Sequence, residues 1–479
     1  MTGRSVAVVV AALATAGVVL RAWILRSEIG ALDADEAAWG TMARHVLDGE
    51  VSAFFWDQNY GGTQETLLTA AVFATTGAST ETLRVVPILL FAAAALLTWR
   101  VGIRTVGEPY ARLAAGAFWA WSPYVLWKST RAHGFYGSGL VLSLAVVLLA
   151  LRLAERPSRR DGLLLGLALG LGWWATPQFL VLAAPAVGWL AWRRRDLLRH
   201  AWLPAGAFLV GALPWLWANV THGWYSLSGP PPGGTAFDRL ENLAVTNLPS
   251  ALGLRLPFTL EWIGGAVVGT LLYALAAFAI AATVVRRRAE LGPLVPALLL
   301  FPLFYATAPH TWLITEPRYL VFLGPVLALL LVASGGTPRR AAAIACALAV
   351  LTAVGVAKLD RAAPPVVFED GVGMPPDIDP LLHTLAERNI RDAYADYWIA
   401  WLIVWETDEQ TIAVPLGQPG VEEGRYRPFY RRVASNPSAA HVFLRGSDQE
   451  PLQRQALLKA GYRPVHAAEF VVYVPPGRP

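Results

Sequence analysis

Three carboxylates lie within four residues near the start of the chain, at Asp33, Asp35 and Glu36. Such a cluster beside apolar segments favours a carboxyl group with a raised pKa, because like charges repel and burial disfavours ionisation. A carboxyl group of this kind suits general-base catalysis on a hydroxyl. The structural alternative is a solvated turn whose aspartate caps the following helix. Carboxylate clusters also suit hard cations, so the same residues are candidate ligands for Mg²⁺ or Mn²⁺.

The composition places these carboxylates in a membrane protein. The 479 residues are 55% hydrophobic and 15% charged, whereas soluble domains carry about 25% charged residues. Apolar stretches of about twenty residues recur along most of the chain, each long enough to cross a bilayer. The net charge of +5 comes from Arg residues in short loops and does not indicate nucleic-acid binding. The single cysteine, Cys346, excludes an internal disulfide and a Cys-rich metal site.

Hydropathy predicts about eleven membrane spans, the first of them retained rather than cleaved as a signal peptide. Pro177 is expected to separate two short spans as a tight hairpin. The predicted spans are 6–25, 83–103, 111–127, 135–153, 162–176, 178–192, 201–219, 263–285, 291–308, 318–333 and 340–357.

Arg residues gather in alternate loops, which all fall on one side if eleven spans are drawn. The loops carry the clusters at 100–112, 152–160, 193–199, 286–288 and 339–340. Short basic loops stay in the cytoplasm, so the N-terminus is expected inside and the C-terminal segment outside. The outward segments are then 26–82, 128–134, 220–262, 309–317 and 358–479.

The expected fold is an all-α polytopic membrane domain, 1–357, followed by a small extracytoplasmic α/β domain, 358–479. The boundary is placed where Pro and charged residues become frequent and no further span is possible. Within the first outward loop, 35–47 and 65–75 are predicted to be interfacial helices. In the C-terminal domain, strands are predicted at 411–414, 441–444 and 469–474, and helices at 380–388 and 449–460.

The run Asp35-Glu36-Ala37-Ala38-Trp39, soon after a first transmembrane helix, resembles the Asp-Glu motif of GT-C glycosyltransferases. The resemblance is to protein O-mannosyltransferases, the aminoarabinose transferases of lipid A and related bacterial enzymes. It covers about 1–335 and rests on the order of short motifs. The further motifs are 60–65, Arg84, Ser122-Pro123, 131–136 and 316–319. The run 394–398 is also similar to bacterial members, with no role attached to it.

The resemblance implies a GT-C fold and transfer of a sugar from a polyprenyl-phosphate donor to an acceptor outside the cytoplasm. The acceptor class stays open between protein, glycolipid and cell-envelope polysaccharide. An outward site needs a donor anchored in the cell membrane, because nucleotide sugars are cytoplasmic. The motif match makes Asp35 the general base, with Glu36 and Asp33 as second choices, and in-line attack would invert the anomeric centre.

Cations on the outer side are expected to bind the donor phosphate, because the planar Arg fork holds two phosphate oxygens. The candidates are Arg84, Arg131, His133 and Arg318. The alternative is snorkelling of long basic side chains toward headgroups, which is favoured for Lys128. Candidates for binding sugar or acceptor are Tyr60, Glu65, Tyr136, Gln178, Glu316 and Tyr319. For the carboxylates the alternative is ion pairing with Arg84 and Arg318, and for the aromatic residues it is an interfacial belt.

Two other functions compete with sugar transfer. A transporter or flippase for a lipid-linked substrate should carry ionisable residues at mid-membrane depth, but the predicted spans are nearly free of Asp, Glu and Lys. A non-catalytic membrane scaffold is the third possibility. The segment 170–175 matches a dinucleotide fingerprint in letters only, since no strand precedes it. Instead, Gly162, Gly166 and Gly170 are predicted to allow close helix packing.

Overall fold

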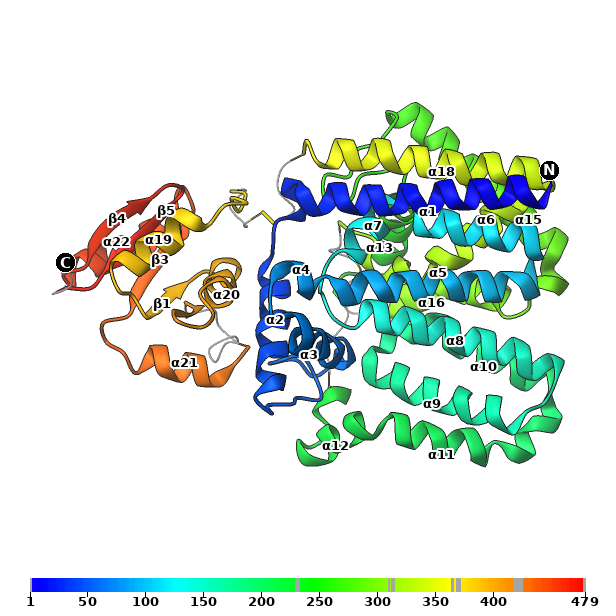
Figure 1. Ribbon diagram of the computed structural model, residues 1–479, viewed down its shortest axis with the longest axis horizontal. Coiled ribbons are helices and arrows are strands. Elements are labelled where there is room, and N and C mark those ends of the chain that lie inside the picture. Colours follow the sequence, from blue (N-terminus) through cyan, green and yellow to red (C-terminus); the bar gives the residue numbers. More distant parts are fainter. Residues whose placement is uncertain are drawn as a thin grey trace. The chain divides into compact units, whose positions relative to one another are not determined.

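The structure is a computed structural model that describes residues 2–228, 233–308, 311, 315–362, 366–367, 372–416 and 425–476. The chain forms two compact units (Figure 1). The helical unit comprises Met1–Arg26, Asn59–Glu65 and Arg84–Ala362. The α/β unit comprises Ser27–Gln58, Thr66–Leu83 and Ala363–Pro479, so it combines the C-terminal segment with much of the predicted first outward loop.

Among the described residues, five helices are long and apolar enough to cross a membrane. They are α1 (Gly3–Arg26), α4 with α5 (Thr80–Thr105), α8 (Tyr136–Glu155), α15 (Ala266–Leu291) and α18 (Pro338–Leu359). Their exposed surfaces carry large apolar side chains such as Leu96, Leu271 and Phe278, as lipid-facing helices require. This part of the chain is therefore a multi-pass membrane bundle.

Shorter helices complete the bundle, and two predicted spans are not straight. The predicted span 111–127 is wrong as a single helix, because α6 (Glu108–Trp119) ends before Pro123 starts α7 (Pro123–Ser129). The predicted span 201–219 is bent by 64° between α11 (Trp202–Gly211) and α12 (Leu213–Thr221). Hydropathy records apolar length but not such breaks. The other helices of this unit are α9 (Arg159–Ala175), α10 (Leu180–Arg193), α13 (Ala236–Glu241), α14 (Leu248–Ala251), α16 (Leu294–Thr307) and α17 (Gly324–Ser334).

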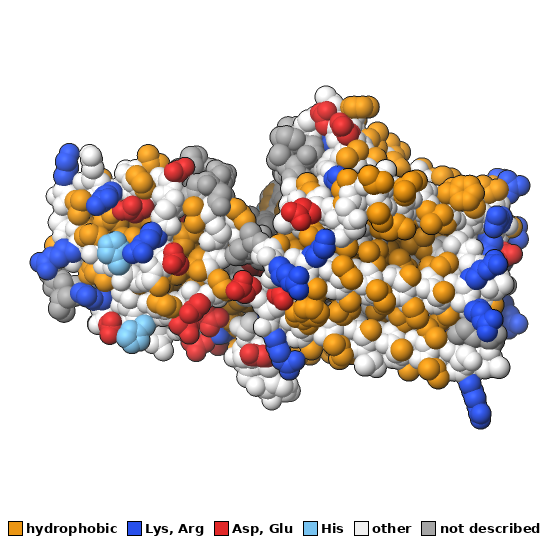
Figure 2. All heavy atoms as spheres, turned by 90° about the horizontal axis from the view of Figure 1, so that it is seen from above, with side chains coloured by type: hydrophobic (Ala, Val, Ile, Leu, Met, Phe, Trp, Pro, Cys, Tyr) orange, Lys and Arg blue, Asp and Glu red, His pale blue; other side chains and the backbone are white. Residues whose placement is uncertain are grey.

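Basic residues mark one end of the helical unit. The C-terminal turns of α5, α8, α10 and α15 contain Arg104, Arg152, Arg193 and Arg288. The first turn of α18 contains Arg339 and Arg340. Figure 2 shows Lys and Arg side chains gathered at this end, while hydrophobic side chains cover the flank of the bundle. The segment that follows α18 therefore begins at the opposite end, because α18 starts among the Arg residues.

Glycines allow α9 and α11 to pack closely. A Cβ atom added at Gly166 would lie 2.0 Å from the Pro204 carbonyl oxygen, and one added at Gly170 would lie 2.1 Å from that of Phe208. The prediction of close packing is confirmed at these two glycines. It is wrong at Gly162, where a Cβ atom would have nothing within 4 Å.

The α/β unit contains a five-stranded sheet in the order β2-β1-β3-β5-β4. β1 pairs in parallel with β2 and β3, whereas β5 pairs antiparallel with β3 and β4. The three predicted strands are confirmed as β2 (Ile412–Pro415), β3 (Ala440–Leu444) and β5 (Phe470–Val474). The two predicted helices are confirmed as α19 (Asp379–Glu387) and α22 (Gln449–Lys459).

In the described part of the C-terminal segment, two strands and two helices were not predicted. β1 (Asp392–Ala395) and β4 (Arg463–Ala467) are short and carry few β-branched residues. α20 (Tyr397–Glu406) is buried on all sides from Ile399 to Trp405, so its sequence has no amphipathic period. α21 (Arg427–Ala434) has eight residues. The predicted helices of the first outward loop are confirmed as α2 (Ala34–Leu47) and α3 (Gln64–Thr76), and α4 (Thr80–Leu83) follows them.

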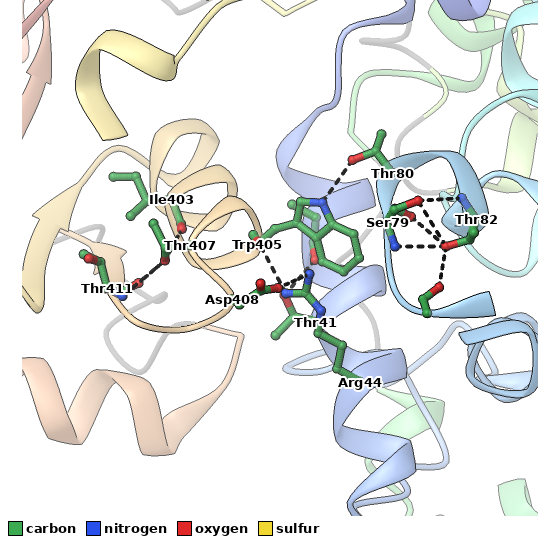
Figure 3. A network of polar contacts seen from close by, with 12 residues as sticks. Thr41, Arg44, Ser79, Thr80, Thr82, Ile403, Trp405, Thr407, Asp408 and Thr411 are labelled. Carbon is green, nitrogen blue, oxygen red and sulfur yellow. Dashed lines mark hydrogen bonds and ion pairs between the residues drawn. The ribbon is translucent and has the colours of Figure 1, made fainter. Parts of the chain in front are cut away.

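The Trp405 side chain joins α2 to α20 (Figure 3). Its indole nitrogen donates to Thr80 Oγ1 at 3.1 Å, and the Arg44 guanidinium lies 3.7 Å from the ring centroid. Arg44 also donates to the Trp405 carbonyl oxygen and pairs with Asp408 at 2.7 Å. A Cβ atom at Gly40 would lie 2.5 Å from the Trp405 ring, so the close contact requires glycine.

The α9–α11 contact generates a matched test. Gly170→Ala should lower the melting temperature of the purified protein, because the added methyl group meets the α11 backbone and overpacking costs about 1–3 kcal/mol. Gly162→Ala should leave it unchanged or raise it, because alanine favours a helix by about 1 kcal/mol over glycine. Melting of both variants in detergent checks this, and equal melting temperatures would contradict the proposed close packing.

Candidate functional site

The three carboxylates at the start of α2 differ in their surroundings. Asp33 caps the helix: its Oδ1 accepts from the backbone N–H of Glu36 at 2.9 Å. The capping alternative is thus confirmed for Asp33, although the residue is buried rather than solvated. Glu36 is fully buried at 0% exposure, whereas the Asp35 side chain is 37% exposed. Asp35 is therefore the most accessible of the three to a reacting hydroxyl.

Asp35 is held by two residues of the C-terminal segment. Its Oδ1 accepts from the Tyr397 hydroxyl at 2.6 Å and from Arg425 Nη2 at 3.0 Å. Arg425 Nε also donates to the Tyr397 hydroxyl oxygen. Burial, and then the charge of Asp35, raises the pKa of Tyr397 well above its usual range. The hydroxyl therefore stays protonated and donates a hydrogen bond to the carboxylate. We call these three residues the Asp35 cluster.

The Asp35 cluster lies where parallel strands end. β1 ends at Ala395, and Asp396 then caps α20 by accepting from the Trp398 N–H at 2.9 Å. Tyr397 is therefore the first helical residue after β1. Arg425 lies on the connection that follows the neighbouring parallel strand, β2, and directly before α21. The carboxyl ends of parallel strands are the edge at which open α/β sheets commonly bind ligands.

The contacts of Tyr397 and Arg425 with Asp35 were not expected from the sequence. Tyr397 belongs to the run 394–398, to which no role was attached, and no motif includes Arg425. The two contacts to Asp35 join residues 362 and 390 positions apart in the chain. The strand-to-helix junction after β1 would have been a usable signal for Tyr397, had β1 been recognised.

His45 fixes the other end of α2. Its Nδ1 lies 2.9 Å from Glu50 Oε2, and its Nε2 lies 3.0 Å from Glu409 Oε2. Burial lowers the pKa of His45, but hydrogen bonds to Glu409 and Glu50, together with their charges, outweigh burial, so the pKa is raised. Because both ring nitrogens face carboxylates, the arrangement favours the doubly protonated imidazolium.

Four candidates come together with Lys128 in the helical unit, and Lys128 is buried instead of snorkelling. Lys128 Nζ lies 2.8 Å from His133 Nδ1 and 4.1 Å from the centroid of the Tyr136 ring. Glu316 pairs with Arg318, so the ion-pair alternative is confirmed for these two residues. We call these five residues the Lys128 cluster.

The charges of the Lys128 cluster compensate one another. Burial raises the pKa of Glu316, but the charges of Arg318, Lys128 and His133 outweigh burial, so its pKa is lowered and the carboxylate stays ionised. The Arg318 side chain is 44% exposed while that of Glu316 is 9% exposed. Arg318 is therefore a cation fixed by a buried carboxylate but still accessible.

Glu65 accepts a hydrogen bond from the first turn of α8. Its Oε1 accepts from the Ser138 backbone N–H at 2.8 Å, which satisfies one of the free donors of the first helical turn. Burial raises the pKa of Glu65, against the opposing effects of Ser138 and the nearby Lys128. The described contacts of Glu65 are thus structural and place it beside the Lys128 cluster.

The remaining candidates belong to the same helical unit. Tyr60 and Tyr319 are both close enough to Tyr136 to interact with it electrostatically. Arg131 is 2% exposed and lies 5.0 Å from the Trp127 ring centroid, so it is buried in protein instead of snorkelling. Arg84 is likewise buried, directly before α5. Gln178 lies in the short turn Pro177–Phe179 between α9 and α10, half-buried.

The acidic start of α2 does not fit a divalent cation. Asp33 Oδ1 accepts a backbone hydrogen bond, and Asp35 Oδ1 already has a guanidinium as its partner. Within the described residues, no group of three or more His, Cys, Asp or Glu side chains could hold a metal ion.

Known structures share this fold, although no family model and no curated relative matches the chain in sequence. ArnT from Cupriavidus metallidurans bound to undecaprenyl phosphate is 13% identical with a TM-score of 0.64, and 98% of each chain is covered. The Archaeoglobus fulgidus oligosaccharyltransferase in complex with Zn and sulfate is 11% identical with a TM-score of 0.53. That match covers 98% of this chain and 74% of the other.

A second structure of the archaeal enzyme, AglB with an inhibitory peptide and a dolichol-phosphate, is 11% identical with a TM-score of 0.50. It covers 99% of this chain and 75% of AglB. ArnT, a lipid A aminoarabinose transferase, and AglB are GT-C glycosyltransferases. The chain therefore has the GT-C fold that its motifs predict, with a mostly helical part and a small C-terminal sheet.

The His45 contacts predict a pH dependence of stability. Because folding raises the pKa of His45 above 6.5, this contribution is fully present below about pH 6.5 and is lost as the pH rises through the folded-state pKa. His45→Gln should remove this part of the pH dependence. Melting curves of the wild type and the variant on both sides of neutrality check the effect. Parallel curves for the two proteins would contradict it.

Proposed function

We propose that this chain is an integral membrane glycosyltransferase that moves a sugar from a polyprenyl-phosphate-linked donor to an extracytoplasmic acceptor. The observation that carries the proposal is the carboxylate of Asp35: one oxygen is tethered by Tyr397 and Arg425, and the side chain is 37% exposed on a GT-C fold. The acceptor class stays open between protein, glycolipid and cell-envelope polysaccharide.

In the proposed reaction, the acceptor hydroxyl attacks the anomeric carbon of the donor sugar. Asp35 takes the hydroxyl proton as the new carbon–oxygen bond forms, so Asp35 is the general base. The bond between the anomeric carbon and the phosphate oxygen breaks, and polyprenyl phosphate leaves with the electron pair. Attack opposite the leaving group inverts the anomeric centre. A phosphate leaving group needs no general acid, so one carboxylate is sufficient.

Donor binding is proposed for the cations of the Lys128 cluster in the helical unit. Arg318 is accessible yet held by the buried Glu316, and Lys128 and His133 lie in the same cluster. Charge-assisted contacts to the phosphate oxygens would bind the donor and stabilise the charge that develops on the leaving group. Tyr136 and Tyr319 are proposed to contact the sugar. ArnT is described with undecaprenyl phosphate and AglB with a dolichol-phosphate, which supports a lipid-linked donor here.

We infer the orientation in the membrane from the basic end of the helical unit. The Arg-bearing turns of α5, α8, α10, α15 and α18 are placed on the cytoplasmic side. The extracytoplasmic domain, 358–479, then follows α18 on the outer side, with 1–357 as the membrane domain. This orientation gives the site access to lipid-linked sugars but not to nucleotide sugars.

The transporter alternative gains no support from the buried charge in α1. The Arg21 guanidinium donates to Ser129 Oγ at 2.9 Å and to the Trp119 carbonyl oxygen at 2.8 Å. It also lies 3.6 Å from the centroid of the Trp119 ring. These contacts tie α1 to its neighbours, as a structural role predicts.

Removal of the base should abolish transfer. With purified protein and a panel of radiolabelled polyprenyl-phosphate sugars, we expect Asp35→Asn to transfer about 10²–10⁴-fold more slowly than the wild type. Asp48→Asn is the matched control, because it makes the same change at the exposed C-terminal end of α2. Full activity of Asp35→Asn would exclude this base. A wild type that neither binds nor uses any donor would instead favour a scaffold.

Replacement of Arg318 should weaken donor binding. Arg318→Lys keeps the charge but loses the planar fork, and a charge-assisted hydrogen bond is worth about 1.5–3 kcal/mol. We therefore expect the KM for the donor to rise by about 10-fold or more with a smaller change in kcat. Arg340→Lys, at the basic end of α18, is the control. Unchanged donor KM in Arg318→Lys would remove Arg318 from the phosphate site.

A further inference from the structure

The Asp35 carboxylate is held in an asymmetric way. Both of its contacts, from the Tyr397 hydroxyl and Arg425 Nη2, are made to Oδ1. From the residues that the structure describes, Oδ2 accepts no hydrogen bond, and the side chain is 37% exposed. A base that must accept a proton in one direction needs this arrangement: one oxygen fixes the carboxylate plane and the other keeps its lone pairs available.

Arg425 is itself rigidly placed. Its guanidinium lies 4.3 Å from the Phe55 ring centroid and 4.9 Å from the Tyr397 ring centroid. Phe55 in turn stacks on Trp39 of α2, with centroids 4.4 Å apart and an interplanar angle of 9°. The Arg425 side chain is 16% exposed. A solvent-exposed ion pair would have little orienting effect, whereas a stacked and half-buried guanidinium has few alternative positions.

The origin of the two residues also points to a functional site. Tyr397 follows the carboxyl end of β1, and Arg425 lies on the connection after its parallel neighbour β2. Open α/β sheets place ligand-binding residues at this edge. Here the edge receives a carboxylate from α2, a helix that belongs to the first outward loop.

We propose that Tyr397 and Arg425 are positioning residues for Asp35, so that the C-terminal domain forms part of the active site. This inference rests on the proposed function. The two side chains fix Oδ1 and direct Oδ2 toward the acceptor hydroxyl, whose proton is transferred to Oδ2 as the oxygen attacks the sugar. The C-terminal domain then contributes to the chemical step and is not only a cover or a partner-binding module.

The test compares full-length Tyr397→Phe, Arg425→Lys and Arg425→Ala in the transfer assay. We expect kcat to fall about 10–100-fold in Tyr397→Phe and Arg425→Ala with little change in the KM for the donor, because a misplaced base affects the chemical step. Arg425→Lys should recover part of the loss. Free guanidinium should restore activity to Arg425→Ala but not to Asp35→Asn.

Arg432→Ala is the matched control, because Arg432 also pairs with an aspartate of this unit, Asp392 at 2.8 Å, but away from Asp35. It should keep wild-type kcat. The double variant Asp35→Asn/Arg425→Ala should be no slower than Asp35→Asn, because a positioning residue has no effect once its base is gone.

The outcomes separate the two hypotheses. Wild-type kcat in Tyr397→Phe and in Arg425→Ala, with Asp35→Asn inactive, would overturn the positioning role and leave the proposed function intact. Multiplicative losses in the double variant would also overturn the positioning role, since they would indicate a general structural effect. An inactive wild type would overturn both. If Arg425→Ala does not fold, Tyr397→Phe and Arg425→Lys still decide the question.

Discussion

The close contact between Trp405 and Gly40 is the constraint on which the Asp35 cluster depends. A helix of fourteen residues such as α2 is marginal by itself. It becomes a rigid support because the indole ring fills the space that a side chain at position 40 would occupy. Arg44 also lies against the ring and pairs with Asp408. The start of α2 can therefore present Asp35 at a fixed position.

A different constraint governs the helical unit, where charges are buried among membrane helices. Two buried carboxylates there have defined partners: Glu316 pairs with Arg318, and Glu65 accepts from the N-terminal turn of α8. Unpaired charges in such surroundings would neutralise or distort the packing. Pairing keeps the Lys128 cluster charged in an apolar environment. The same pairing limits how far any one cation can be changed without disturbing its neighbours.

Much of the architecture could be predicted because it depends on local sequence patterns. Hydropathy located the long helices, and a short motif after α1 selected Asp35 as the proposed base. The break between α6 and α7 escaped prediction because apolar length does not reveal where a helix stops. The roles proposed for Tyr397 and Arg425 were not predicted, because these residues contact Asp35 only in the folded chain, where β1, β2 and α2 come together. Close helix packing was predicted for both Gly170 and Gly162, but only Gly170 contacts another helix. Spacing along the sequence does not show which residues of a helix face a neighbouring helix.

The distance along the chain between Asp35 and its two partners has a consequence for biosynthesis. Asp35 leaves the ribosome early, whereas Tyr397 and Arg425 follow 362 and 390 residues later. During this interval α2 lacks the helix that packs against it and the two groups that orient its carboxylate. A nascent or truncated chain would therefore hold the helical bundle with the Asp35 carboxylate not yet oriented. The proposed orientation of Asp35 is therefore complete only when nearly the whole polypeptide has been made.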